Sequence, residues 1–296
     1  MTLLSPYLLD AAVRSASPES LFLDFVIPRI PQRERPGVLL IDVGASSGTF
    51  VISAARAGLR VKAFEPSPRC SKVLMPRVAA FLAERGRGGG AAGTSASVSV
   101  HCAAVGHRSG AASFTDRGLG STARYLSPSS SSAASANDSS SGASGTSVPV
   151  LRLEEALRAN ESGFVLKTDT QGFERNVLLG ADAHLRRKAP RLLLVELSDG
   201  LLRAQGTSAL ELMRTIASYD YDCTFLQLYG GYHKGGSRGR GSRARPCYPC
   251  SRRKPLSGWM RVDAPAAIAN RSTISFEEMT LLLGQLRGWT DLLCWW

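Results

Sequence analysis

Apolar, β-branched residues recur along the chain in short blocks, most of them the length of one buried strand. The block VLLIDVG at residues 38–44 runs into a glycine-containing loop and then into a helical pattern from Phe50 to Ala57. A second apolar block, LRVKAFEP, follows at residues 59–66. Strand, helix and strand within about thirty residues form a βαβ unit with parallel strands. This region therefore predicts a parallel α/β sheet.

Further blocks extend the pattern to the C-terminus. Helical patterns occur at residues 70–85, 151–159, 208–218 and 276–287, a helix begins near Glu174, and strand patterns occur at residues 97–106, 163–172, 190–198, 221–229 and 289–296. Strands that alternate with helices predict a doubly wound, Rossmann-like α/β fold. In this fold a seven-stranded, mostly parallel sheet carries helices on both faces.

Prolines and low-complexity segments predict the domain organisation. Residues 1–36 hold two apolar stretches closed by prolines and predict an N-terminal helical arm, whereas residues 37–296 predict a single domain. Gly-rich and Ser-rich stretches at about 86–97 and 127–147 predict disordered loops, because their composition buries too little apolar area to offset the ordering entropy. A basic insertion is expected at about 230–270.

The positive charge of the chain is local. The 296 residues carry a formal net charge of +12, but nine Lys and Arg lie within residues 234–261, where no acid occurs, so the rest carries +3. Nucleic acid is therefore an alternative partner through this segment, against the favoured solvated loop. No apolar run reaches the ~18 residues of a transmembrane helix. Because Pro6, Asp10 and Arg14 interrupt any signal-peptide core, we expect a cytoplasmic protein.

The six cysteines are too few and too scattered for a disulfide framework in a chain of this length, which predicts reduced thiols. Cys247 and Cys250 form one Cys-x-x-Cys, but a structural zinc needs four ligands, and only His233 lies nearby as a further candidate. A redox pair is expected at a strand-to-helix junction and not between prolines. Two loop cysteines are therefore favoured, and no metal site is predicted.

The loop after the first strand reads Asp42-Val-Gly44-Ala-Ser46-Ser-Gly48. Glycine allows the backbone to turn sharply there and to approach a ligand closely. A dinucleotide site would need Gly-x-Gly-x-x-Gly, but Ser46 and Thr49 occupy the second and third glycine positions, and no Gly-Lys-Ser/Thr of a P-loop occurs. The loop therefore argues against a pyrophosphate. Taken alone, it is also compatible with a purely structural turn.

A second acid, Glu65, at the tip of the second strand narrows the choice of ligand. Its carboxylate offers only acceptors and is able to bind both ribose hydroxyls, whereas Asp42 is placed to meet a cationic amino-acid group through the loop or a water. A nucleoside that carries an amino acid and no phosphate is S-adenosylmethionine. The residues predicted to bind this cofactor are Asp42, Gly44, Ser46, Ser47, Gly48, Thr49, Phe50, Glu65, Pro66, Ser67, Ala104 and Val105.

Five blocks also resemble those of the FkbM-type class I methyltransferases. They are IDVGASSGTF, FEPSP, AAVGHRSGAASF, VLKTDTQGFERNVLLGA and PRLLLVELS, and the resemblance covers about Val38 to Gln227. It implies a seven-stranded sheet with a reversed final hairpin, S-adenosylmethionine as methyl donor, and O-methylation of a hydroxyl. Ser46 stands where the family most often has asparagine, and Gln171 where it commonly has glutamate.

Lys167, Asp169 and Glu174 cluster at the carboxyl end of a buried strand, the edge of an α/β sheet where ligands bind. Methyl transfer to an alcohol needs an aligned nucleophile and a group that takes its proton, so Asp169 is predicted to be this base or a substrate anchor. Lys167 pairs with Asp169 or is a strand residue in a salt bridge, and Glu174 is catalytic or only satisfies the helix dipole. Glu196 lines the acceptor pocket or is a rim carboxylate, and His184 is interpreted as a surface helix residue.

The acceptor is not readable from the sequence, because its pocket is built from loops. We expect a hydroxyl on a small molecule or a glycan. Two alternatives stay open. One is an RNA-binding or RNA-modifying protein that uses the basic insertion, and the other is an inactive scaffold with a methyltransferase fold.

Overall fold

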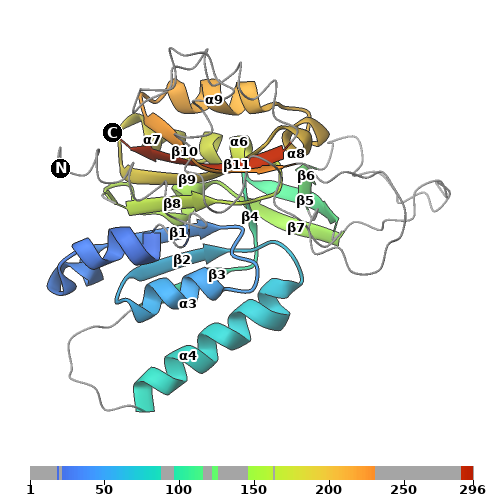
Figure 1. The fold of residues 1–296 in the computed structure, drawn as a ribbon. Coiled ribbons are helices and arrows are strands. Elements are labelled where there is room, and N and C mark those ends of the chain that lie inside the picture. Colours follow the sequence, from blue (N-terminus) through green and yellow to red (C-terminus); the bar gives the residue numbers. More distant parts are fainter. Residues whose placement is uncertain are drawn as a thin grey trace, which may run out of the picture.

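The structure is a computed structural model that describes residue 19 and residues 22–87, 97–115, 122–125, 146–162, 164–230 and 288–295. In these residues the main sheet has seven strands in the order β10-β11-β9-β8-β1-β2-β3 (Figure 1). All neighbouring pairs are parallel except those of β11, which is antiparallel to both β9 and β10. The bounds are β1 Leu39–Val43, β2 Arg60–Phe64, β3 Val98–His101, β8 Phe164–Thr168, β9 Pro190–Ser198, β10 Asp222–Gly230 and β11 Gly288–Trp295. The predicted α/β class with a mostly parallel sheet is confirmed.

Helices cover the main sheet on both faces. In Figure 1, α3 and α4 lie on one side of the sheet, and α6, α7 and α9 lie on the other. The helices are α3 Thr49–Arg56, α4 Met75–Arg87, α5 Leu153–Ala156, α6 Glu174–Leu179, α7 Asp182–Arg186, α8 Asp199–Ala204 and α9 Ala209–Ala217, with shorter turns of π or 3₁₀ type at η1 Phe22–Val26, η2 Ile27–Arg29, η3 Gln32–Gly37 and η4 Cys70–Leu74.

The apolar pattern of β1 explains this layering. Successive side chains of a strand point to opposite faces. Leu39, Ile41 and Val43 accordingly pack in one apolar cluster and Leu40 in the other. Both β1 and β8 are buried along their whole length, as expected for parallel strands between two helix layers.

A second, four-stranded sheet with the order β4-β7-β5-β6 was not predicted (Figure 1). Its strands are β4 Ala104–Val105, β5 Gly110–Thr115, β6 Thr122–Tyr125 and β7 Thr146–Leu151. The single strand expected at 97–106 is in fact two, because the chain leaves the main sheet after β3 and pairs with β7 instead of β2. The second sheet encloses a small apolar cluster that includes Phe114 and Val150.

Several sequence predictions fall partly or wholly outside the described residues. Helix α4 continues to Arg87 and β7 begins at Thr146, so each predicted loop is shortened at one end, and residues 88–96 and 126–145 are not described. The basic insertion after Gly230 and the predicted helix at 276–287 also lie outside. In the described part of the N-terminal arm, the Phe22 ring packs edge-on against the Phe50 ring, with the centroids 5.8 Å apart.

The prediction of reduced thiols is wrong for four of the cysteines. Cys70 is bonded to Cys102, and Cys223 to Cys294, with Cα atoms 5.5 and 4.1 Å apart. The sequence spacing hid both pairs, because each partner comes from a different element. Cys223 and Cys294 are directly opposite in the β10–β11 pair, a register that only the folded sheet creates. The other two cysteines lie outside the described residues.

The described helices include none that is long and apolar enough to span a bilayer.

Candidate active site

The loop after β1 is shaped by contacts within the protein. The backbone N–H groups of Gly44 and Ala45 donate to the carbonyl oxygen of Phe64 at 2.9 and 3.0 Å. Gly44 has a φ of +88°, and a Cβ atom at this position would overlap the carbonyl oxygen of Asp169. The glycine is therefore required by close backbone packing, which couples this loop to the turn that follows β8.

Gly48 directly precedes α3 and has a φ of +77°, and a Cβ atom there would overlap the side chain of Leu74. Between the two glycines, the carbonyl of Ser47 accepts a hydrogen bond of 2.7 Å from Nη1 of Arg77 in α4, and the hydroxyls of Ser47 and Thr49 are 3.3 Å apart. Sequence reasoning missed Arg77, which lies on a helix without a motif. Arg77 therefore holds this loop through a contact from the neighbouring helix α4.

Glu65 follows β2 with its carboxylate clamped by two backbone amides. Its Oε2 accepts a hydrogen bond from the N–H of Ser46 at 2.7 Å, and its Oε1 accepts one from the N–H of Ser67 at 2.9 Å. Glu65 is buried, and Pro66 between the two is half-buried. Because a carboxylate oxygen has two lone pairs, each oxygen keeps one acceptor position. The structure thus brings three predicted cofactor residues together around a carboxylate that is able to accept two more hydrogen bonds.

Lys167 is the buried cation at the centre of the site. Its Nζ lies 3.3 Å from Oδ1 of Asp42, 3.5 Å from Oε1 of Glu19 and 3.6 Å from Oδ2 of Asp169. Burial lowers the pKa of Lys167, but the three carboxylates outweigh it and raise that pKa above its usual range, so the ammonium stays charged. Burial raises the pKa of Asp42, and Lys167 opposes this rise. The cation that Asp42 contacts in the structure is therefore Lys167.

The turn between β8 and α6 is built around the carboxylate of Glu174. Its Oε1 accepts hydrogen bonds from the Thr170 N–H at 2.8 Å, the Thr170 hydroxyl at 3.0 Å and the Gly172 N–H at 3.1 Å. Burial raises the pKa of Glu174 to about 7, although these bonds lower it. Gly172 has a φ of +100°, and a Cβ there would overlap the carbonyl of Leu201. The contacts of Glu174 are those of a residue that shapes the turn.

Asp169 presents the accessible carboxylate of this turn, with 40 % of its side chain exposed. Nε2 of Gln171 lies 3.2 Å from Oδ1 of Asp169 and 3.1 Å from both carboxylate oxygens of Glu196. Glu196 is buried on β9, and burial together with the negative charge of Asp169 raises its pKa to about 10. Asp291 on β11 is also buried and lies opposite Glu196 in the β9–β11 register. Sequence reasoning missed Asp291, which meets the site only through the reversed strand.

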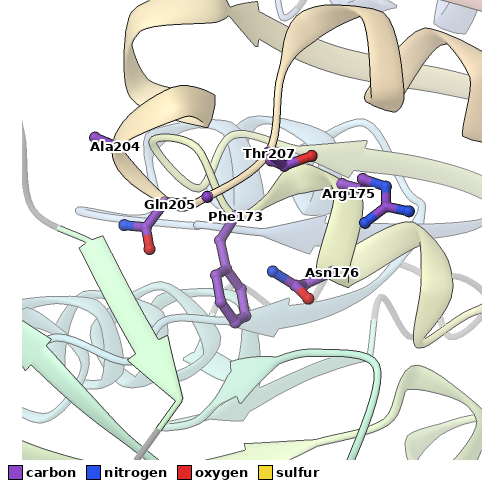
Figure 2. A pocket seen from close by; sticks show the side chains of 7 residues that line it. Phe173, Arg175, Asn176, Ala204, Gln205 and Thr207 are labelled. Atoms are coloured by element: carbon purple, nitrogen blue, oxygen red, sulfur yellow. The ribbon is translucent and has the colours of Figure 1, made fainter.

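A pocket of about 480 Å³ opens beside this turn (Figure 2). It is lined by Phe173, Arg175, Asn176 and the segment from Ala204 to Thr207 between α8 and α9. In Figure 2 the Phe173 ring and the Asn176 amide point towards the green strands of the second sheet. Oδ1 of Asn176 lies 2.7 Å from Nδ1 of His107, which precedes β5. Polar side chains therefore dominate a pocket that begins at the end of the Asp169–Glu174 turn.

Three predicted cofactor residues lie apart from the polar part of the loop. Ala104 and Val105 on β4 are buried, and their side chains belong to apolar clusters. Any contact of these residues with a ligand would therefore involve their backbone atoms. Phe50 is buried in the core, with its ring centroid 6.0 Å from Nζ of Lys167. The interpretation of His184 as a surface residue is wrong, since it is buried in an edge-on contact with Phe164. Only one face of α7 is exposed, and the period of this short helix was not recognised.

The described residues contain no group of three or more His, Cys, Asp or Glu side chains in an arrangement that would bind a metal ion.

The sequence matches a known protein family over more than half of its length. Residues 42–223 match the family described as Methyltransferase FkbM domain. The match begins at Asp42 in β1 and ends at Cys223 in β10, so it contains the glycine loop, Glu65 and the turn at Asp169. No curated protein matches the sequence.

Three solved structures share a distant likeness with the chain. A precorrin-6y C5,15-methyltransferase from Geobacter metallireducens is 10% identical, with 99% of this chain and 89% of that chain covered and a TM-score of 0.36. A geranyl diphosphate methyltransferase in complex with SAM is 9% identical, with 92% and 82% covered and a TM-score of 0.39. The plantazolicin methyltransferase BpumL in complex with SAH is 7% identical, with 99% and 96% covered and a TM-score of 0.32. These TM-scores are too low to place residues or a ligand in this chain.

Proposed function

The chain belongs to the FkbM methyltransferase domain family and is an S-adenosylmethionine-dependent methyltransferase, and from this premise we propose that it methylates a hydroxyl oxygen with Asp169 as the base. The observation that carries the proposal is the position of the Asp169 carboxylate. It is 40 % exposed, its Oδ2 lies 3.6 Å from the Lys167 ammonium, and its backbone carbonyl touches Gly44 of the cofactor loop. An accessible carboxylate therefore lies next to the loop that is predicted to bind the cofactor.

The charge distribution supports S-adenosylmethionine as the cofactor. Lys167 is the one cation in contact with the three carboxylates Asp42, Asp169 and Glu19 among the described residues, which leaves an excess of negative charge. Oδ2 of Asp42 is buried and has no hydrogen-bond partner in the described structure. The sulfonium and ammonium groups of S-adenosylmethionine would be attracted to these carboxylates. The acceptor positions left on Glu65 fit the two hydroxyls of a ribose.

S-adenosylmethionine supplies a methyl group bonded to a positively charged sulfur. The residues of the chain have to orient an acceptor hydroxyl towards that carbon and to remove its proton. The Lys167 ammonium lies 3.6 Å from Oδ2 of Asp169, and the Gln171 amide nitrogen lies 3.2 Å from Oδ1. General base catalysis of this kind contributes about 10²-fold to 10⁴-fold to a rate.

The polar pocket beside the turn is our candidate site for the remainder of the acceptor. Asn176, Gln205, Thr207 and Arg175 offer hydrogen-bond donors and acceptors around the Phe173 ring. Such a lining suits a hydroxylated small molecule or a glycan, because a sugar pairs its hydroxyls with side-chain amides and its apolar face with an aromatic ring. The acceptor class therefore stays a small molecule or glycan with a free hydroxyl.

Transfer of label tests the proposal. The chain is incubated with S-adenosylmethionine carrying a tritiated methyl group and with a cell extract separated into small molecules, glycans, RNA and protein. We expect label in the small-molecule or glycan fraction, released by treatments that cleave ethers and not by mild base. Label in RNA or protein would contradict the proposed acceptor, and an absence of label in every fraction would contradict the transfer.

The variant Asp169→Asn distinguishes a role of Asp169 as the base from a role in cofactor binding. The amide keeps the size of the side chain but accepts no proton, so we expect transfer to fall about 10²-fold or more while the affinity for S-adenosylmethionine changes little. Asp220→Asn is a matched control, since Asp220 is exposed on the turn after α9. Full transfer by Asp169→Asn at saturating acceptor would rule out Asp169 as the base.

RNA modification remains a prediction that rests on the basic segment at 234–261, which lies outside the described residues. Binding through such a segment would fall steeply with salt concentration. Deletion of residues 235–254 would then abolish RNA binding and leave cofactor binding intact.

A further inference from the structure

Two carboxylates of the candidate active site are bridged by one neutral amide. Gln171 lies in the turn after β8 and reaches Oδ1 of Asp169 at 3.2 Å and both oxygens of Glu196 at 3.1 Å. Its backbone has a φ of +57°, a left-handed conformation that few residues other than glycine, asparagine and aspartate adopt readily. A left-handed backbone at a residue that bridges two acids suggests that this residue has a function.

The two bridged acids differ in their surroundings. Asp169 is accessible and faces the Lys167 ammonium, whereas Glu196 is 8 % exposed and faces further acids. The titratable groups that act on Glu196 are Asp169 from the end of β8, Glu174 from α6 and Asp291 from β11. All three are carboxyl groups. Two ionised carboxylates cannot lie this close in a buried site, so the pair carries a proton, and the buried member is the one that keeps it.

We propose that Gln171 is a positioning residue that fixes Asp169 and Glu196 as a pair that shares one proton, which is held on the buried Glu196. This inference rests on the proposed function, in which Asp169 is the base. It adds Glu196 and Gln171 to the machinery of the reaction and explains why only one carboxylate of this acidic cluster accepts a proton from the acceptor.

The acceptor hydroxyl, Asp169 and Glu196 account for every proton in the methyl-transfer step. The O–H bond of the acceptor breaks and its proton goes to Asp169, an O–C bond forms to the methyl carbon, and the electron pair of the broken S–C bond stays on sulfur. After the step both members of the pair are neutral. One proton must leave to solvent from the exposed Asp169 before the next turnover.

An amide suits position 171 for a specific reason. The NH₂ group of glutamine has two N–H donors, one for each carboxylate, and no charge. A glutamate in its place would add a third carboxylate, which has acceptors only and repels both neighbours when it is ionised. In Gln171→Glu the introduced carboxyl group is able to donate a hydrogen bond only while it is protonated. It loses this proton as pH rises, and the bridge between the two acids is then lost.

The shared proton is measurable without an acceptor. The full chain is labelled with ¹³C at glutamate carboxyls, and each resonance is followed by NMR as a function of pH, with Glu196→Gln used to assign the signal. We expect Glu196 to remain protonated at pH 7 and to titrate in the alkaline range. In Asp169→Asn the midpoint should fall by at least about one pH unit, because a like charge and a hydrogen-bond partner are removed.

Asp220→Asn is the control for this titration, because it makes the same chemical change at an exposed site. It should leave the Glu196 midpoint in place. An ordinary acidic midpoint for Glu196, or the same midpoint in wild type and in Asp169→Asn, would overturn the pairing.

The role of Gln171 is tested by kinetics with the labelled donor and the extract fraction that the wild-type chain methylates. Gln171→Asn keeps an amide and tolerates the left-handed backbone but is one methylene shorter. We expect its turnover at saturating donor to fall about tenfold or more, with an unchanged KM for the donor. Gln171→Glu should lose activity as pH rises, whereas the wild type should not.

Gln32→Glu is the matched control, since Gln32 is exposed in η3, which precedes β1. It should keep the wild-type pH profile. If Gln171→Asn and Gln171→Glu both keep the wild-type turnover and pH profile, Gln171 has no positioning role. If the wild-type chain methylates no fraction, the proposed function fails, and the NMR titration still decides whether the pair exists.

Discussion

Individual residues of the candidate site are held in place by other residues of the protein. Gly44 was expected to let a cofactor approach the backbone. In the structure its missing Cβ makes room for the carbonyl of Asp169, and the N–H of Asp169 in turn donates to the Val43 carbonyl at 3.0 Å. The loop after β1 and the turn after β8 therefore hold each other in place.

Gly44→Ala tests this coupling. A Cβ atom at position 44 overlaps the Asp169 carbonyl, and a φ of +88° is strained for alanine, so we expect the free energy of unfolding to fall by about 2 kcal/mol or more. Urea denaturation measures the change. Gly37→Ala is the control, because a Cβ there meets nothing within 4 Å, and its free energy of unfolding should stay close to wild type. Equal stability of the two variants would contradict the coupling.

Glu65→Gln tests the ribose contact. The change replaces one acceptor oxygen with an NH₂ group, which cannot accept from Ser46, Ser67 or a ribose hydroxyl. We expect the Kd for S-adenosylmethionine to rise about tenfold or more, measured by isothermal titration calorimetry. Glu84→Gln, on the exposed face of α4, makes the same change away from the site and should keep the wild-type Kd. An unaltered Kd for Glu65→Gln would remove Glu65 from the cofactor site.

At the scale of elements, the disulfide between Cys70 and Cys102 links the start of η4 to the end of β3, on either side of Glu65. Cys102 directly follows β3, whose last residue His101 accepts a hydrogen bond of 3.1 Å from the N–H of Glu65. Cys70 begins η4, three residues after Ser67. The covalent link therefore restrains both sides of the Glu65 segment. The second disulfide, between β10 and β11, lies at the other edge of the main sheet.

The two disulfides form a matched pair for experiment. We expect the double change Cys70→Ala and Cys102→Ala to raise the Kd for S-adenosylmethionine several-fold, because the Glu65 segment loses a restraint. The double change Cys223→Ala and Cys294→Ala should lower stability by ~2–4 kcal/mol and leave this Kd in place. Calorimetric titration and urea denaturation of both variants separate the outcomes. A Kd that responds equally to both changes, or to neither, would contradict a local role for the first disulfide.

At the scale of the whole molecule, the buried carboxyl groups make stability depend on pH. Burial raises the pKa of Glu196 to about 10 and that of Glu174 to about 7. Above pH ~4.5 the unfolded chain has lost these protons, while the folded chain still binds them. Between pH ~4.5 and about 10 the folded state therefore binds more protons than the unfolded state, and the free energy of unfolding falls as pH rises.

Glu196→Gln should remove part of this dependence. Because the variant has no proton to lose at position 196, its stability relative to wild type should increase with pH between about 5 and 9, by up to ~1.4 kcal/mol per pH unit. Urea denaturation at several pH values measures the difference. Glu84→Gln serves as the exposed control, and a constant difference between Glu196→Gln and wild type would show that Glu196 is ionised in the folded protein.

The sequence by itself determined the layers of this protein and the strand ends at which the candidate site lies. Alternating apolar blocks gave the strands β1, β2, β8 and β9, because parallel strands between two helix layers are buried on both faces. The glycine loop and Glu65 were found because a turn with positive φ and a carboxylate at a strand end leave a local signature. These signals are visible in the local sequence, although the contacts that require Gly44 and Gly48 come from other elements.

Only the tertiary structure decided which residues meet. Arg77, Asp291 and the two disulfides come from elements far apart in the chain, and the second sheet forms from short strands whose apolar pattern is weak. The contact of Gln171 with both Asp169 and Glu196 depends on the left-handed turn that Glu174 and Gly172 impose after β8. These relations are set by strand order and register, and each residue alone gives no sign of its partner.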